Sequence, residues 1–227
     1  MIIKGLQKLT LLDFPGRVGC TIFMAGCNFR CPFCHNASLV VKNGGYAIPE
    51  EEIFDFLEKR RGRLSGVCIS GGEPTLQPDL IPFIKRVRDM GYAVKLDTNG
   101  YRPEVLSELI SGGLVDYIAM DIKTSRERYS AVAGVDIDIS KIEESADMIM
   151  RSGIDYEFRT TVVKELHSAE DFTNIGNWLS GANAFFLQSF ADSGDCIKSG
   201  LNGYDKNGLC DLLNLLKVKI PSAKIRG

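Results

Sequence analysis

The sequence predicts an α/β protein in which a parallel sheet with outer helices curls into a partial (β/α)6 barrel. Short apolar runs typical of strands alternate along the chain with amphipathic helical patterns, and no repeat, low-complexity tract or linker interrupts this alternation. Six strand–helix units in succession favour a parallel sheet with its helices outside. The chain has 227 residues, enough for one substantial core. We therefore expect a single domain spanning residues 1–227.

The expected elements follow one another in regular order. Strands are expected at residues 18–24, 67–70, 93–97, 115–121, 156–163 and 184–190. Helices are expected at residues 49–61, 78–90, 103–111, 140–151, 169–179 and 205–216. Several helices begin at a proline, whose missing N–H costs nothing in the first turn. Ile53, Phe54 and Leu57 have the spacing of a helix face that packs on a core. Ligand sites on such sheets gather at the carboxyl ends of the strands, so polar motifs there are candidates for a functional site.

The bulk composition is that of an ordinary globular protein. Hydrophobic residues make up 44% of the chain and charged residues 25%. The formal net charge of −2 gives no indication of nucleic-acid binding. No apolar run reaches the ~20 residues needed to span a bilayer, and the first residues lack the apolar region of a signal peptide. We expect a cytoplasmic protein without a membrane or nucleic-acid partner. Seven cysteines, three of them clustered, fit a reducing compartment better than a disulfide framework.

Three cysteines form a C-x3-C-x2-C array, Cys27, Cys31 and Cys34, directly after the first expected strand. Thiolates suit iron–sulfur clusters and zinc. A [4Fe–4S] cluster normally takes four cysteines, so three leave one iron open to a small molecule. Zinc would need a fourth ligand, and the nearest candidate, His35, adjoins Cys34 and is poorly placed to share its ion. Free cysteines can also be buried core residues. We favour the cluster over zinc, and zinc over the core interpretation.

The second expected strand runs into Ser-Gly-Gly-Glu-Pro. A tight turn at Gly71 and Gly72 lets the backbone approach a ligand closely, and Glu73 adds an oxygen acceptor at the strand end. Several oxygen acceptors together suit an ammonium group. Gly-Gly before Glu-Pro is also an ordinary way for a strand to turn into a helix, so this motif gains its meaning from the cysteine array that precedes it.

Two further strand ends carry charged motifs. The third strand ends in Asp-Thr-Asn-Gly at residues 97–100, which also fits a simple Asp/Asn-Gly turn. The fourth ends in Asp121, Ile122 and Lys123, where a lysine can equally be a solvated exit residue. Arg159, on the fifth strand, either faces the cleft or pairs with a carboxylate inside the barrel.

The array, read as C-x3-C-x-aromatic-C with Phe33 as the aromatic residue, resembles the signature of radical S-adenosylmethionine (SAM) enzymes. The longer string Cys-Pro-Phe-Cys-His-Asn resembles the glycyl-radical-enzyme activases, above all the anaerobic ribonucleoside-triphosphate reductase activating proteins. The resemblance covers most of the chain, is strongest before Lys123 and thins after Arg159. It implies a barrel of radical SAM type, with a [4Fe–4S] cluster on the three cysteines and SAM at the open iron.

The resemblance also assigns roles to the other motifs. It implies that the Gly-Gly-Glu motif holds the methionine ammonium of SAM, and that Lys123 meets the SAM carboxylate. It makes Asp97, Thr98 and Asp121 candidates for a monovalent cation or for the ribose. It places Phe33, His35 and Asn36 around the adenine. The chain departs from the formate-lyase activases at the last barrel strand, where it has Gln188 in place of a histidine.

The activity that the resemblance implies is reductive cleavage of SAM. One electron from a flavodoxin or ferredoxin-type reductant yields methionine and a 5′-deoxyadenosyl radical, which forms a glycyl radical on a partner, the anaerobic ribonucleoside-triphosphate reductase. An incomplete barrel would admit an extended glycine-containing loop, beside a mobile flap at residues 189–207 and with Asp13 as a partner contact. The alternatives are a radical SAM enzyme acting on a small molecule or a tRNA base, and a zinc-binding structural or interaction protein.

Overall fold

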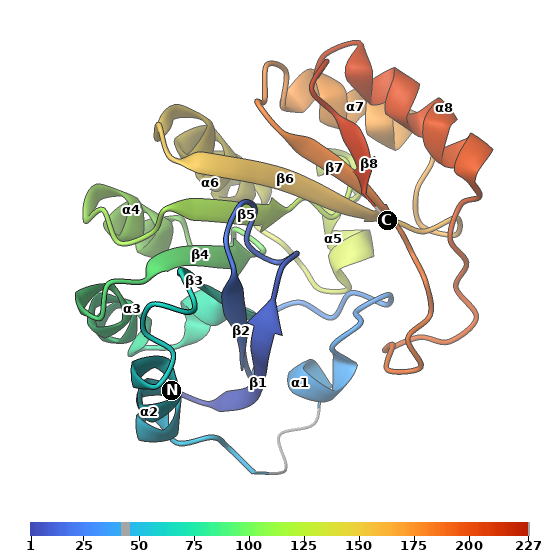
Figure 1. Ribbon diagram of the computed structural model, residues 1–227. Helices are drawn as coiled ribbons and strands as arrows, with labels where there is room; N and C mark the ends of the chain where they lie inside the picture. Colours follow the sequence, from blue (N-terminus) through green and yellow to red (C-terminus); the bar gives the residue numbers. More distant parts are fainter. Residues whose placement is uncertain (42–45, 227) are drawn as a thin grey trace.

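The computed structural model describes residues 1–41 and 46–226, in which eight strands form one sheet in the order β1-β2-β3-β4-β5-β6-β7-β8 (Figure 1). β1 pairs with β2 in antiparallel fashion, and every later pair is parallel. The strands are β1 (Ile3–Thr10), β2 (Gly19–Met24), β3 (Gly66–Gly71), β4 (Ala93–Thr98), β5 (Tyr117–Asp121), β6 (Asp155–Val162), β7 (Phe185–Ser189) and β8 (Lys224–Arg226). The predicted parallel sheet is confirmed, and its two edge strands, β1 and β8, do not pair with each other within the described residues.

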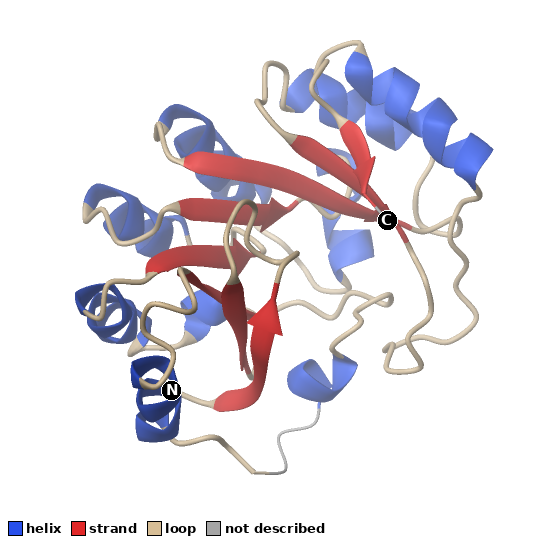
Figure 2. Ribbon diagram, viewed as in Figure 1, coloured by secondary structure: helices blue, strands red, loops and turns tan. Residues whose placement is uncertain are grey.

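The longer helices cover the outer face of this sheet (Figure 2). The helices are α1 (Ala37–Val41), α2 (Glu50–Glu58), α3 (Leu80–Asp89), α4 (Pro103–Ser111), α5 (Tyr129–Ala133), α6 (Ile139–Arg151), α7 (Ala169–Trp178) and α8 (Lys206–Lys217). The short helices α1 and α5 lie beside the cysteine loop. α4 begins at its proline, and α2 buries Ile53, Phe54 and Leu57 as expected. In the part of the chain that the structure describes, no helix combines the length and the apolar character needed to cross a bilayer.

All six expected strands and all six expected helices are present, with boundary shifts of a few residues. The additional elements are short or irregular. β1 loses its register with β2 between Ile3 and Gly5 and again between Gln7 and Thr10. Such irregularities break the alternation of inward and outward side chains on which a strand prediction depends. β8 has three residues and the helices α1 and α5 have five each, too few to show a period.

The carboxyl ends of the parallel strands lie at one edge of the sheet, where the cysteine loop follows β2 (Figure 1). The segment after β7, expected to be a mobile flap, is fastened to this loop. Ser38 donates to Asp195 Oδ2 from its backbone N (3.1 Å) and its Oγ (2.7 Å). Lys198 N donates to Pro32 O at 2.9 Å. These contacts make the segment a strap that supports the cysteine loop from outside.

Candidate functional site

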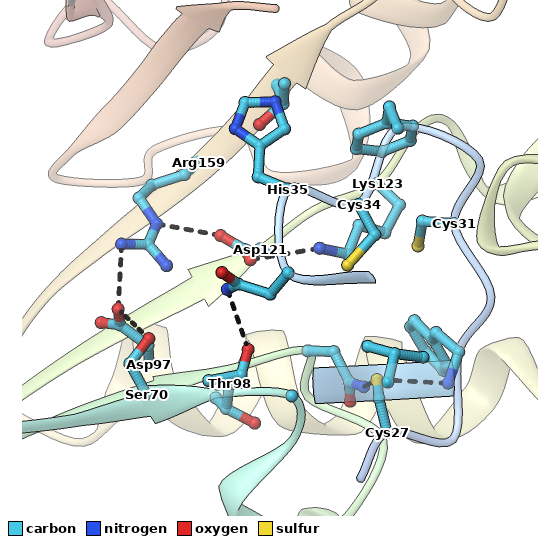
Figure 3. A pocket seen from close by; sticks show the side chains of 18 of the residues that line it. Cys27, Cys31, Cys34, His35, Ser70, Asp97, Thr98, Asp121, Lys123 and Arg159 are labelled. Atoms are coloured by element: carbon cyan, nitrogen blue, oxygen red, sulfur yellow. Dashed lines mark hydrogen bonds and ion pairs between the residues drawn. The ribbon is translucent and has the colours of Figure 1, made fainter. Parts of the chain in front are cut away.

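A pocket at the carboxyl ends of the strands brings together nearly all the residues that the sequence singled out (Figure 3). The predicted residues that line it are Cys27, Cys31, Phe33, Cys34, His35, Asn36, Gly71, Gly72, Asp97, Thr98, Lys123 and Arg159. Asp121 and Gln188 line it as well. Glu73 is the one predicted site residue that does not. Residues that lie up to 161 positions apart in the sequence therefore share one cavity because successive parallel strands end at the same edge.

The cysteine loop is shaped by its own backbone and by aromatic packing. Phe29 N donates to Cys27 Sγ at 3.3 Å, and Cys34 N donates to Cys31 O at 3.0 Å. The Phe29 ring is buried and meets the ring of Tyr129 edge-on, with centroids 6.5 Å apart. These contacts hold the three thiols along one side of the pocket, opposite Arg159 in Figure 3.

The three thiols are free of disulfides, and burial disfavours their ionised form in the absence of a metal. Burial raises the pKa of Cys27 to about 12 and of Cys31 to about 11, and the nearby Lys123 ammonium acts in the opposite direction on both. Burial likewise raises the pKa of Cys34. No three His, Cys, Asp or Glu side chains in residues 1–41 and 46–226 are grouped to hold a single metal ion. A [4Fe–4S] cluster is held through separate irons, and three free thiols around one space fit it.

The Gly-Gly turn packs directly against the start of the cysteine loop. Gly71 has φ +116°, and a Cβ there would lie 2.4 Å from backbone atoms of Met24. A Cβ on Gly72 would lie 2.1 Å from Gly26 O. Only glycine fits both positions. Glu73 N donates to Gly26 O at 2.8 Å, and Asn36 Nδ2 donates to Gly71 O at 3.3 Å. The turn thus joins the end of β3 to both ends of the cysteine loop.

The Glu73 carboxylate is fully buried and does not line the pocket. Its Oε2 accepts from Asn99 N at 2.6 Å, and its Oε1 accepts from Thr98 Oγ1 at 2.8 Å. Burial raises the pKa of Glu73, and these hydrogen bonds act in the opposite direction. The side chain therefore fixes the turn after β4. The backbone of Gly71 and Gly72, rather than this carboxylate, faces the pocket.

Charged side chains alternate in sign across β4, β5 and β6 (Figure 3). Arg159 Nε donates to Asp121 Oδ1 at 2.9 Å, and its Nη1 lies 3.5 Å from Asp97 Oδ2. Lys123 Nζ donates to Asp121 Oδ2 at 3.1 Å. Lys95 Nζ, almost completely buried, donates to Asp97 Oδ1. We call Lys95, Asp97, Arg159, Asp121 and Lys123 the charged row.

The rings of Phe33 and His35 also line the pocket. Phe33 is buried, 6.2 Å between centroids from the His167 ring. His35 lies at the pocket mouth, and its ring is 5.3 Å from that of Phe190, just after β7. Partial burial lowers the pKa of His35, although Asp192 acts in the opposite direction. The pocket lining thus combines aromatic rings, which suit a flat base, with charged groups, which suit a zwitterion.

Sequence reasoning missed Lys95 and Ser70, which both bind Asp97, the latter from its Oγ at 3.0 Å. The signal for Lys95 was available: it precedes Asp97 by two positions on one strand, so both side chains face the same way. Asp13, expected to contact a partner, does not line the pocket, and its carboxylate accepts from Thr21 Oγ1 at 2.5 Å.

A model of the radical SAM superfamily matches residues 21–178, a span that holds the cysteine array, the Gly-Gly turn and the charged row. The chain belongs to the radical SAM superfamily. MJ1227 of Methanocaldococcus jannaschii, provisionally named a glycyl-radical enzyme activating enzyme, is 34% identical over 198 residues, which cover 83% of this chain and 80% of MJ1227. The pyruvate formate-lyase-activating enzyme of Clostridium pasteurianum is 30% identical over 138 residues, which cover 58% of this chain and 57% of that enzyme.

A solved structure with SAM bound has the same fold. Streptococcus suis SuiB bound to S-adenosylmethionine superposes with a TM-score of 0.70 at 16% identity, over 90% of this chain and 49% of SuiB. As a radical SAM protein, this chain uses a [4Fe–4S] cluster and SAM. Family membership sets aside the zinc-binding structural protein that the cysteine array alone left open.

Proposed function

We propose that this radical SAM protein is a glycyl-radical-enzyme activase, whose partner is an anaerobic ribonucleoside-triphosphate reductase. The observation that carries the proposal is the 34% identity to MJ1227 over 83% of the chain. The Cys-Pro-Phe-Cys-His-Asn string supports the same class of enzyme and the choice of partner.

In this function, different residues of the pocket would hold the cluster and the separate parts of SAM. Cys27, Cys31 and Cys34 would hold the cluster, which together with SAM supplies the electron and the radical chemistry. The backbone carbonyls of the Gly-Gly turn offer acceptors to the SAM ammonium, and Lys123 offers a cation to its carboxylate. Phe33, His35 and Asn36 form the wall for the adenine. Burial opposes the charge on Lys123, but Asp121 raises the pKa of Lys123, so it is protonated at neutral pH.

The open sheet supports a protein substrate. Among the described residues the edge strands β1 and β8 are unpaired with each other, so the barrel is incomplete on one side. An extended peptide loop can enter a side opening, whereas a small-molecule pocket is usually concave and closed over its ligand. The net charge of −2 also gives no basic face for the phosphates of a tRNA substrate.

The test is to incubate the reconstituted, reduced protein with SAM and an anaerobic ribonucleotide reductase, using a flavodoxin or ferredoxin system as electron donor. We expect an electron paramagnetic resonance doublet from a glycyl radical, absent when the partner's radical-site glycine is replaced by alanine. SAM cleavage that a small metabolite or a tRNA stimulates, and that no such reductase stimulates, would assign the protein to another class of radical SAM enzyme.

A further inference from the structure

We propose that the Arg159 guanidinium takes the place of a monovalent cation between Asp97 and Asp121, so that SAM binding here requires no added cation. The resemblance to the activases made these two carboxylates, with Thr98, candidates for binding a monovalent cation or the ribose. The inference rests on the proposed SAM site beside Lys123, and it is independent of the identity of the protein partner.

Arg159 is built into this position by the sheet. It is the register partner of Asp121 in the β5–β6 pair, so the two side chains extend side by side. Its Nε donates to Asp121 Oδ1 at 2.9 Å, while its Nη1 lies 3.5 Å from Asp97 Oδ2 on β4. Only 14% of the Arg159 side chain is exposed. The guanidinium therefore bridges two carboxylates that come from different strands.

The remaining oxygens of the candidate cation site also face donors. Asp97 Oδ1 accepts from Lys95 Nζ, and Asp121 Oδ2 accepts from Lys123 Nζ at 3.1 Å. Thr98 Oγ1 donates to Glu73 Oε1 at 2.8 Å and accepts from Gly100 N at 3.1 Å. Hard cations bind where several oxygen lone pairs converge. Here the lone pairs converge on ammonium and guanidinium groups, so these residues do not fit a monovalent cation.

The charge balance points in the same direction. The charged row contains three cations and two carboxylates, so it carries one positive charge in excess. Glu157, 3.9 Å from Arg159, does not change this excess because it pairs with Arg226. An added cation would double the excess, whereas the carboxylate of SAM would neutralise it. The row is thus complementary to the ligand without a metal ion.

Calorimetry of SAM binding to the reconstituted protein tests this inference, at constant ionic strength in sodium, potassium and choline chloride. We expect the wild-type Kd to agree within about twofold in the three salts. Arg159→Leu leaves the two carboxylates unbridged, so in choline its affinity should fall by roughly ten- to a hundredfold, as for the loss of one charged hydrogen bond. Sodium or potassium should restore most of this loss. Arg159→Lys should keep the cation independence.

Thallium-205 resonance gives a readout that requires no SAM. We expect saturable Tl⁺ binding in Arg159→Leu and none in the wild type. Arg126→Leu is the matched control, because Arg126 pairs with Glu143 on the surface and lies outside the pocket. Wild-type affinity that rises several-fold with sodium or potassium overturns the inference, and this result needs no variant to fold. Wild type that binds no SAM in any salt overturns the proposed site together with the inference.

Discussion

Asp121 accepts hydrogen bonds from two cations, Arg159 and Lys123, which lower the pKa of its carboxyl group. Burial alone would raise its pKa, but the Arg159 guanidinium and then the Lys123 ammonium lower the pKa of Asp121 to about 2 from its ordinary value of 3.8. A lowered pKa means that the carboxylate stabilises the fold above pH 3.8, and that this stabilisation is lost as the pH falls toward 2. We expect Asp121→Asn to flatten the fall in melting temperature between these two pH values. If the melting temperature falls with pH equally steeply in the variant and the wild type, this expectation is wrong.

The three cysteines differ from the other four in what surrounds them. They line one pocket, whereas Cys210 lies on α8. If each thiolate holds its own iron, as we propose, replacing Cys27, Cys31 or Cys34 by Ala should abolish [4Fe–4S] assembly. Iron and sulfide analysis after anaerobic reconstitution measures this, with Cys210→Ala as the control that keeps full iron content. Full iron in two of the three single variants would show that the ligands are wrongly assigned.

At the scale of elements, the site depends on how closely the β3 turn approaches the cysteine loop. Gly72→Ala would put a Cβ 2.1 Å from Gly26 O, which forces the two backbones apart. We expect a lower melting temperature and incomplete cluster loading. Gly176→Ala in α7 is the control, because its nearest neighbours lie 3.6 Å away and alanine favours a helix. The expectation fails if the two variants load iron equally.

Elements with a regular pattern could be predicted from the sequence. Helix α2 has a recognisable apolar face within nine residues, and α4 begins at a proline. The central strands are short, mostly apolar stretches of sequence. β1 could not be predicted, because its two register shifts destroy the period that a strand prediction requires.

The sequence was sufficient to predict which motifs meet at the candidate site, because that depends only on the order of the parallel strands. Parallel strands end at one edge, so motifs at successive ends were expected to meet, and they do. The direction of a side chain within a turn was not predictable. Glu73 faces inward because the buried Asn99 N–H and Thr98 hydroxyl need an acceptor there. Arg159 was left with two interpretations, and the structure combines them, since it lines the pocket and pairs with carboxylates.

At the scale of the whole molecule, the short strand β8 supplies the cation that pairs with a buried carboxylate of β6. Arg226 forms two hydrogen bonds of 2.7 Å to Glu157, a carboxylate with 1% of its side chain exposed. Arg226→Leu should lower the free energy of unfolding by about 1–3 kcal/mol, because it leaves a buried charge short of donors. Urea denaturation measures this change. Arg151→Leu, which removes an exposed pair 3.8 Å from Asp147, should cost less than about 0.5 kcal/mol. Equal costs would contradict the special role of β8.

The contacts of the strap at Asp195 and Lys198 can form only late in translation, because these residues lie far after the cysteine loop in the sequence. Asp195 follows its partner Ser38 by 157 residues. At about 5–20 residues per second, the ribosome adds it roughly 8 to 30 s after Ser38. Throughout that interval the cysteine loop lacks the hydrogen bonds that Asp195 and Lys198 later make beside it. A cluster assembled on the growing chain would thus form on a loop without these contacts, and one assembled on the finished chain on a loop that has them.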